Sequence, residues 1–234
     1  MSNNNLVLKA YTNLAENFYN LTNDGVYLID FEKGSFLYVS DHPLLRCGNN
    51  TQDIYKKGVH FYDDYIPFDE ISKIQKFISQ INKNSERIPI GQSKDLVLLL
   101  NFNMVFDRKK IMVHHKINML ETKEYEHARL GLGIVSFSAH SSPGLYFVSL
   151  KNTPYTFQYL PDTDEWTRVE KINISENERT MLRYAQQGHS ILETSFLMFK
   201  STDTVKYYRR NVLEKLEARN ITEAISICKQ YGLL

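Results

Sequence analysis

Four short helices, each with its own start signal, occupy the C-terminal quarter of this 234-residue sequence. In a capping box, a Ser or Asn side chain and a Glu three residues later each satisfy a backbone N–H group at the start of a helix. A further helix begins at Ser201, where Asp203 lies in the first turn and favours the helix dipole. The capping boxes are Ser175 with Glu178, Ser190 with Glu193, and Asn220 with Glu223.

These signals predict a compact helical domain at residues 172–234. Gly188 lies where the first helix should end, because glycine readily adopts the left-handed conformation that terminates helices. Isolated helices of this length are marginal in water, so they must pack on one another. The expected helices span residues 176–187, 191–198, 202–216 and 221–231.

The helix expected over residues 202–216 has two different faces. One stripe carries the cations Lys206, Arg209 and Arg210. From residue 171 onward, ten Lys and Arg stand against seven Asp and Glu, a mild excess that favours a polyanionic partner. The apolar stripe, which is suited to packing on the other helices, consists of Val205, Tyr208, Val212, Leu213 and Leu216.

This region resembles the LuxR-type DNA-binding domain, a four-helix helix-turn-helix module, and the spacing of the family pattern is kept without a gap from Ile174 to Ala224. The sequence departs from the family at residues 191–195, where I-L-E-T-S replaces N-K-E-I-A, and at Asn177, Tyr208 and Ile221. The matching residues are Ser175, Glu178, Leu182, Gly188, Ser190, Glu193, Ser201, Thr204, Val205, Lys206, Lys215, Leu216, Asn220, Glu223 and Ala224.

The resemblance implies that the helix beginning after Ser201 is the recognition helix and enters the major groove of double-stranded DNA. By position in the family motif, the residues expected to contact base edges are Lys206, Tyr207 and Arg210. The residues expected to contact phosphates are Ser201, Thr204 and Arg209. In the family the last helix pairs two subunits, so a homodimer is expected through Ala224, Ile225, Cys228 and Tyr231.

The predicted function is therefore sequence-specific DNA binding in the regulation of transcription. The alternative is a protein-interaction or dimerisation module with a degenerate helix-turn-helix that binds no DNA. The departures in the second helix and the modest charge excess favour this alternative.

The first part of the chain predicts an antiparallel sheet with helices over one face. A helix is expected at residues 5–20, a hairpin at 25–40 and a helical crossover in 41–82, with isoleucines spaced for one buried face. The β-rich stretches that follow should pair consecutively, because their connectors are short. These stretches are 95–107, 110–121 and 128–140.

This order of strands and helices resembles a PAS domain. The expected fold class is α+β, a PAS-like five-stranded antiparallel sheet with a helical crossover, followed by an all-α four-helix LuxR-type helix-turn-helix domain. The crossover helices could then enclose a ligand pocket, and the partner there would be a small molecule or a protein signal. The expected division is 1–143 for the sensory domain, 144–171 for a β-hairpin extension or connector, and 172–234 for DNA binding.

No catalytic, cofactor or metal site is predicted. The histidines do not indicate haem, because the adjacent His114 and His115 alternate faces on a strand and at most one points inward. Cys47 and Cys228 have no metal-ligand spacing and suggest reduced thiols in a cytoplasmic chain. No apolar run is long enough to span a membrane, and no signal peptide is recognisable.

Overall fold

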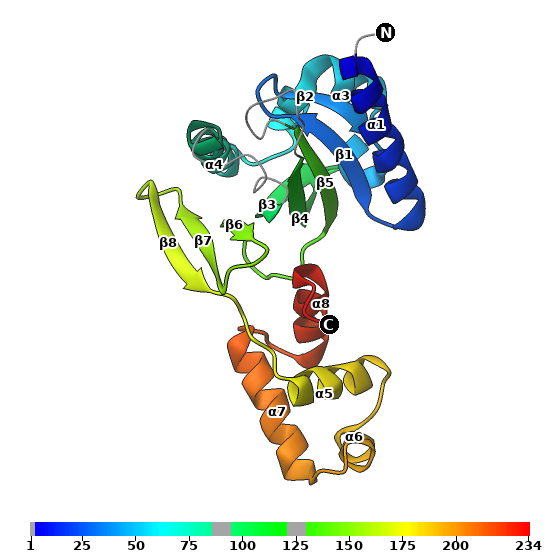
Figure 1. Ribbon diagram of the computed structural model, residues 1–234, viewed down its shortest axis with the longest axis vertical. Coiled ribbons are helices and arrows are strands. Elements are labelled where there is room, and N and C mark those ends of the chain that lie inside the picture. The colour runs from blue at the N-terminus through cyan, green and yellow to red at the C-terminus, as the bar shows by residue number, and fades with distance from the viewer. Residues whose placement is uncertain (1–2, 86–94, 121–129) are drawn as a thin grey trace. The chain divides into compact units, whose positions relative to one another are not determined.

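The computed structural model describes residues 3–85, 95–120 and 130–234. The chain divides into two compact units (Figure 1). Unit 1 comprises residues 1–138 and 142–170, and unit 2 comprises residues 139–141 and 171–234. The ends of two predicted strands, at residue 121 and residues 128–129, lie outside the described part of the chain. The functional division into a sensory and a DNA-binding domain stays a prediction.

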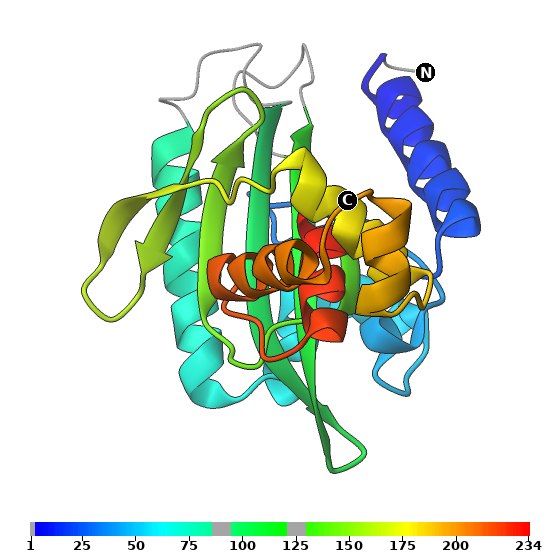
Figure 2. The same ribbon diagram turned by 90° about the horizontal axis from the view of Figure 1, so that it is seen from below.

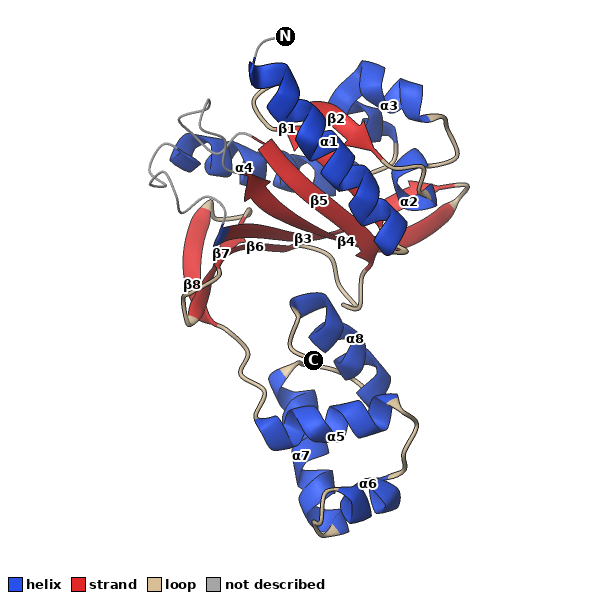
Figure 3. Cartoon of the chain, turned by 45° about the vertical axis from the view of Figure 1, so that its right-hand side comes forward, coloured by secondary structure: helices blue, strands red, loops and turns tan. Residues whose placement is uncertain are grey.

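Unit 1 contains an eight-stranded antiparallel sheet in the order β2-β1-β5-β4-β3-β6-β7-β8 (Figure 3). The first five strands confirm the predicted hairpin and the predicted consecutive pairing of the next three. The strands are β1 (Gly25–Asp30), β2 (Ser35–Val39), β3 (Leu96–Phe106), β4 (Lys109–Leu120), β5 (Leu130–Phe137), β6 (Leu145–Leu150), β7 (Tyr155–Leu160) and β8 (Glu165–Glu170).

The stretch expected to form one hairpin extends the sheet by three strands instead. Its turns lie at residues 151–154 between β6 and β7 and at residues 161–164 between β7 and β8. Because β6 pairs with β3 along six residues, this extension is continuous with the five strands that precede it in the chain.

The predicted helical crossover connects β2 to β3, and one further helix precedes the sheet. Tyr27 and Ile29 belong to the core under the crossover, whereas Val26 and Leu28 alternate with them and are buried on the face that α1 covers (Figure 1). Helices therefore cover both faces at this edge rather than one. The helices are α1 (Asn3–Leu21), α2 (Pro43–Arg46), α3 (Thr51–Lys57), the 3-10 helix η1 (Gly58–Asp64) and α4 (Phe68–Ser85).

Helix α4 is tied to the turn between β7 and β8 (Figure 2). Lys73 Nζ lies 3.2 Å from a carboxylate oxygen of Asp162, and Gln80 donates a hydrogen bond of 2.9 Å to Asp164. The Phe77 ring packs against Trp166 at a centroid distance of 6.0 Å. Polar and aromatic contacts together therefore connect the crossover to the sheet extension.

Unit 2 contains the four predicted helices. In the capping boxes that begin at Ser175 and Ser190, the Ser and the Glu side chains both make their expected hydrogen bonds. Gly188 has a φ of +89°, as expected for the residue that ends the first helix. At the fourth helix the Glu223 carboxylate accepts from the backbone N–H of Arg219 instead of Asn220, so this box is only half formed. The helices are α5 (Glu176–Gln186), α6 (Ile191–Leu197), α7 (Thr202–Lys215) and α8 (Ile221–Tyr231).

A small apolar core and one ion pair with a buried carboxylate hold unit 2 together. The side chain of Glu178 on α5 is 4% exposed, and its Oε2 lies 2.7 Å from Nζ of Lys215 at the end of α7. The ion pair therefore joins the first and third helices beside the core. The fully buried core residues are Ile174, Met181, Leu182, Val205, Val212, Leu216, Ala224, Ile227 and Cys228.

Candidate functional site

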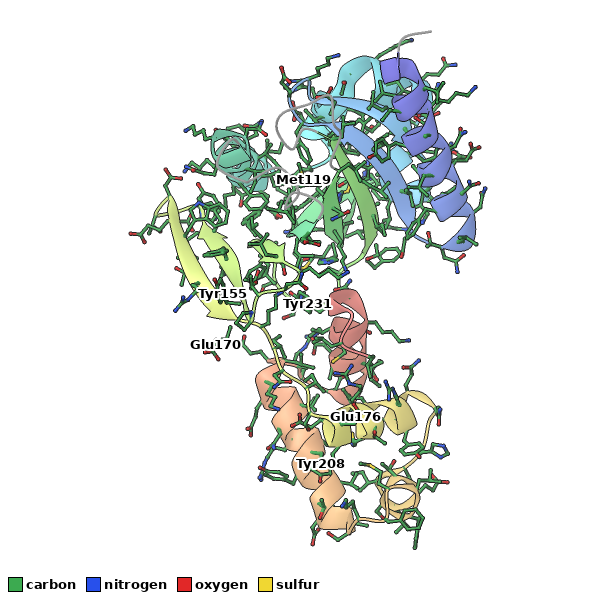
Figure 4. The ribbon with its side chains drawn as sticks, in the orientation of Figure 1. Met119, Tyr155, Glu170, Glu176, Tyr208 and Tyr231 are labelled. Carbon is green, nitrogen blue, oxygen red and sulfur yellow. The ribbon has the colours of Figure 1, made fainter. Side chains whose placement is uncertain are left out.

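Helix α7 is anchored on one face and exposed on the other. Val205 and Val212 are buried in the unit 2 core, one and three turns into the helix, and Leu216 follows at its end. Ser201 caps the helix by accepting a 3.1 Å hydrogen bond from the N–H of Thr204. Tyr208, labelled in Figure 4, is half-buried against the same core. The apolar stripe predicted from the sequence therefore holds α7 in place.

The exposed face of α7 carries two cations and an aromatic ring. Lys206, Tyr207 and Arg210 are all exposed. Lys206 lies 3.3 Å from Asp203, and Arg210 lies 3.9 Å from Glu214. These pairs are open to solvent, where water and salt weaken the attraction between charges. Both cations can therefore exchange their carboxylate partners for another anion or for base edges.

The N-terminal end of α7 offers polar groups of a different kind. The hydroxyl oxygens of Ser201 and Thr204 lie 2.8 Å apart at the exposed start of the helix. Unsatisfied N–H groups and the helix dipole make such an end favourable for phosphate. Arg209 is half-buried, whereas Lys206 and Arg210 are exposed.

The residues assigned to dimerisation on α8 occupy different environments. Ala224 and Cys228 are fully buried in the core of unit 2, so in this packing their side chains cannot contact a second subunit. Tyr231 (Figure 4) is half-buried and its hydroxyl lies 3.0 Å from Nε2 of His140, within the same unit. Ile225 is also half-buried. A dimer through α8 stays a prediction, and its surface would rest on Ile225 and Tyr231.

Helix α6 exposes apolar side chains and buries polar ones. Thr194 and Ser195 are 2% and 5% exposed, whereas Leu192 and Phe196 are 56% and 71% exposed. Phe199, in the turn before α7, is 94% exposed and has a φ of +52°. This inversion coincides with the departure from the LuxR pattern at residues 191–195.

Unit 1 contains a partly open cavity of about 470 Å³ between the sheet and the crossover helices. This volume falls within the range of small-molecule sites in proteins. Buried side chains of the strands form its floor, and η1 and α4 contribute exposed residues at its rim. The pocket that the PAS resemblance implied is therefore present among the described residues.

Metal and membrane features are absent from the described part of the chain. Among residues 3–85, 95–120 and 130–234, no three His, Cys, Asp or Glu side chains lie close enough together to hold a metal ion. None of the helices within these ranges combines the length and the apolar character that crossing a bilayer requires. His127 lies outside the described residues.

A sequence comparison now identifies the helical unit. The family model described as bacterial regulatory proteins, luxR family, matches residues 173–228. Residues 173–228 are a LuxR-family domain. The match contains α5, α6, α7 and most of α8, including the exposed cations of α7. No curated protein matches the chain.

Solved structures show distant similarity to the chain. The phage VqmA–DPO complex is 13% identical with a TM-score of 0.36, covering 96% of this chain and 88% of that chain. The Vibrio cholerae VqmA dimer in the absence of target DNA is 12% identical with a TM-score of 0.33, covering 89% and 83%. The PAS-B domain of Drosophila melanogaster Cycle is 13% identical with a TM-score of 0.36, covering 49% and 99%.

The sequence did not reveal two polar residues of the unit 1 cavity. Tyr27 and His115 come from β1 and β4 and line the cavity together. Strand alternation showed that only one of His114 and His115 could point inward, but it did not show which. The structure decides this, because His115 lines the cavity while His114 is paired with Asn101 through a hydrogen bond between their side chains.

Proposed function

We propose that the chain is a sequence-specific DNA-binding regulator of transcription, and that its PAS-like unit binds a signal molecule. The observation that carries the proposal is the solvent-exposed stripe of Lys206, Tyr207 and Arg210 on a LuxR-family helix anchored by a buried apolar face. An α-helix fits the major groove of B-DNA, where Arg pairs in a bidentate manner with guanine.

In this proposal the residues of α7 divide into two roles. Lys206, Tyr207 and Arg210 contact base edges and specify sequence, whereas Ser201, Thr204 and Arg209 contact phosphates and position the helix. The capped N-terminus of α7 supports the phosphate role of the first two. Two copies of the chain bind as a dimer, with half-sites about one helical turn apart.

The test is duplex binding across a range of salt concentrations, with genomic DNA that co-purifies with the chain as the source of the duplex. Affinity should fall steeply as salt rises, since binding releases condensed counterions. Arg210→Ala should cost about 1–3 kcal/mol at one base position, whereas Arg209→Ala should reduce the slope of log K against log salt by about one.

A matched control removes two cations outside unit 2. Lys9 and Lys110 are exposed side chains of unit 1, so Lys9→Ala/Lys110→Ala changes the net charge as much as Lys206→Ala/Arg210→Ala does. Only the second pair should weaken duplex binding. If that double variant bound genomic fragments as well as the wild-type chain, the assignment of α7 as the recognition helix would be wrong.

The exposed apolar face of α6 favours a second candidate function, a protein-interaction module that binds no DNA. Contiguous exposed apolar side chains often mark interaction surfaces, and Leu192, Phe196 and Phe199 lie on one short segment. This alternative predicts a chain that self-associates, loses association on Phe196→Lys, and retards no duplex at low salt. A gel-shift assay for duplex binding and sedimentation for self-association separate the two functions.

A further inference from the structure

Tyr207 and Arg210 form a pair of side chains on the exposed face of α7. They lie three residues apart, which brings side chains together on one face of a helix. The guanidinium carbon of Arg210 lies 5.7 Å from the centre of the Tyr207 ring, within the range of a cation–π interaction. Tyr207 is 52% exposed, and the side chain of Arg210 is 68% exposed. Neither belongs to the core of unit 2, so the pair is accessible to a partner.

The surroundings of the pair support the Tyr207 ring and leave the donors of Arg210 accessible. The Tyr207 ring lies 6.1 Å from the ring of Tyr208, which packs against the unit 2 core. Nε of Arg210 lies 3.9 Å from a carboxylate oxygen of Glu214. Because both side chains of that ion pair are exposed, solvent and salt weaken it. Arg210 can therefore exchange Glu214 for a base while it stays in contact with Tyr207.

The two side chains suit two different groups of the major groove. A guanidinium presents parallel N–H donors, which match the O6 and N7 acceptors of guanine. The face of an aromatic ring suits an apolar group instead. The apolar group that bases present in the major groove is the C5-methyl group of thymine. A Tyr–Arg pair that enters the groove therefore matches a guanine together with a thymine.

The distance between the two side chains indicates that the two bases are neighbours. Successive base pairs of a duplex lie about 3.4 Å apart along its axis, and apolar groups are in contact at about 4 Å. With the Arg210 guanidinium in the plane of a guanine, the Tyr207 ring at 5.7 Å reaches a methyl group of the next base pair. Entry into the groove also removes water from the pair, which strengthens a cation–π interaction.

We propose that α7 reads a guanine that has a thymine in the adjacent base pair. Arg210 pairs with the guanine, and the Tyr207 ring packs on the methyl group of the thymine. Tyr207 is also a positioning residue, because its ring supports the guanidinium of Arg210. This inference rests on the proposed function, since it names the base step that the DNA-binding helix distinguishes.

The experiment uses the full chain and the duplex that it selects from a randomised library. Arg210→Lys keeps the charge but loses the planar fork of donors, so the position at which this variant loses its preference for guanine identifies the contacted base pair. The thymine beside that guanine is then replaced by uracil, which lacks only the C5-methyl group. This replacement should weaken wild-type binding about fourfold, the equivalent of one buried methyl group. Uracil at more distant positions should have no effect.

Variants of Tyr207 connect the methyl preference to the aromatic ring. Tyr207→Ala should bind the thymine and uracil duplexes equally, and its discrimination between guanine and adenine should fall about threefold, because the guanidinium loses its support. Tyr207→Phe keeps the ring and should retain both preferences. The matched control is Tyr155→Ala in unit 1, where the guanidinium carbon of Arg168 lies 5.0 Å from the centre of the Tyr155 ring. This control removes a similar pair and should leave duplex binding unchanged.

Each contrary result has a distinct meaning. A selected site without thymine beside the guanine, equal wild-type affinity for thymine and uracil, or a methyl preference that persists in Tyr207→Ala would overturn the inference. Loss of the methyl preference in Tyr207→Phe would assign it to the hydroxyl group and would overturn it too. In all these cases duplex binding itself remains, so the proposed function stands. A wild-type chain that binds no duplex would contradict the proposed function, and this inference with it.

Discussion

At the residue scale, the histidines show how position changes the chemistry of one side-chain type. Burial lowers the pKa of His115 to about 3, and this residue lines a cavity. The adjacent His114 is buried on the other face of β4 beside Asn101. His140, in unit 2, also has a pKa lowered by burial, although Glu223 and Glu217 partly oppose this. Each of these differences depends on which groups surround the ring.

His115 should make the stability of unit 1 depend on pH. Its pKa is about 3 in the folded chain and near 6.5 when unfolded, so between these values the unfolded chain binds a proton that the folded chain does not. Stability from this group should therefore be fully present above pH 6.5 and fall as pH drops toward 3, by up to about 1.4 kcal/mol per pH unit.

The measurement is urea unfolding at several pH values, followed by the fluorescence of Trp166. Trp166 is the single tryptophan of the chain and packs in unit 1 against Phe77 and Tyr159. His115→Phe should flatten the pH dependence relative to the wild-type chain. Parallel curves for the two proteins would show that His115 does not titrate as expected.

At the element scale, the contact between α5 and α7 depends on one carboxylate. Burial by itself would raise the pKa of Glu178, but hydrogen bonds from Lys215 and Ser175 outweigh that effect and hold the pKa below its usual value. The stabilisation that ionised Glu178 gives to the folded chain is therefore present above about pH 4.5, and it is lost as the pH falls through the pKa of Glu178 in the folded chain. The cap of α5 and the end of α7 thus share one side chain.

Lys215→Met should destabilise the α5–α7 contact more than Glu178→Gln. Removing Lys215 leaves a buried carboxylate with only Ser175 as a partner, which should cost about 3 kcal/mol. Glu178→Gln removes the charge but keeps an amide oxygen that can accept from Ser175 and Lys215, and about 1 kcal/mol is expected. Amide hydrogen exchange of residues 176–186 and 202–215 measures both changes in the full chain. An equal or reversed order would show that the pair contributes little.

At the scale of the whole molecule, a continuous set of contacts leads from the cavity toward the junction with unit 2. Ile74 and Ile78 of α4 line the cavity, and α4 is tied through Lys73 and Gln80 to the turn before β8. β8 ends at Glu170, labelled in Figure 4, and unit 2 resumes at the next residue of the chain. The helix that lines the cavity is therefore in contact with the hairpin whose last strand precedes residue 171 of unit 2.

The local structure of this chain could be predicted from its amino-acid sequence. Each feature that depends on a few neighbouring residues could be predicted from the sequence. These features are the caps at Ser175 and Ser190, the helix end at Gly188 and the hairpin turns. The exposed stripe of Lys206 and Arg210 was legible for the same reason, since the spacing of a helix places the residues on a face.

The contacts between residues far apart in the chain could not be predicted in this way, because they depend on the fold. The pairing of Tyr27 with His115 requires the order of three strands and the missing side chain of Gly133, which no local pattern encodes. The burial of Ala224 and Cys228 also depends on how α8 packs against the other helices. Local propensities act over a few residues, whereas burial and long-range hydrogen bonds are set by the packing of the whole domain.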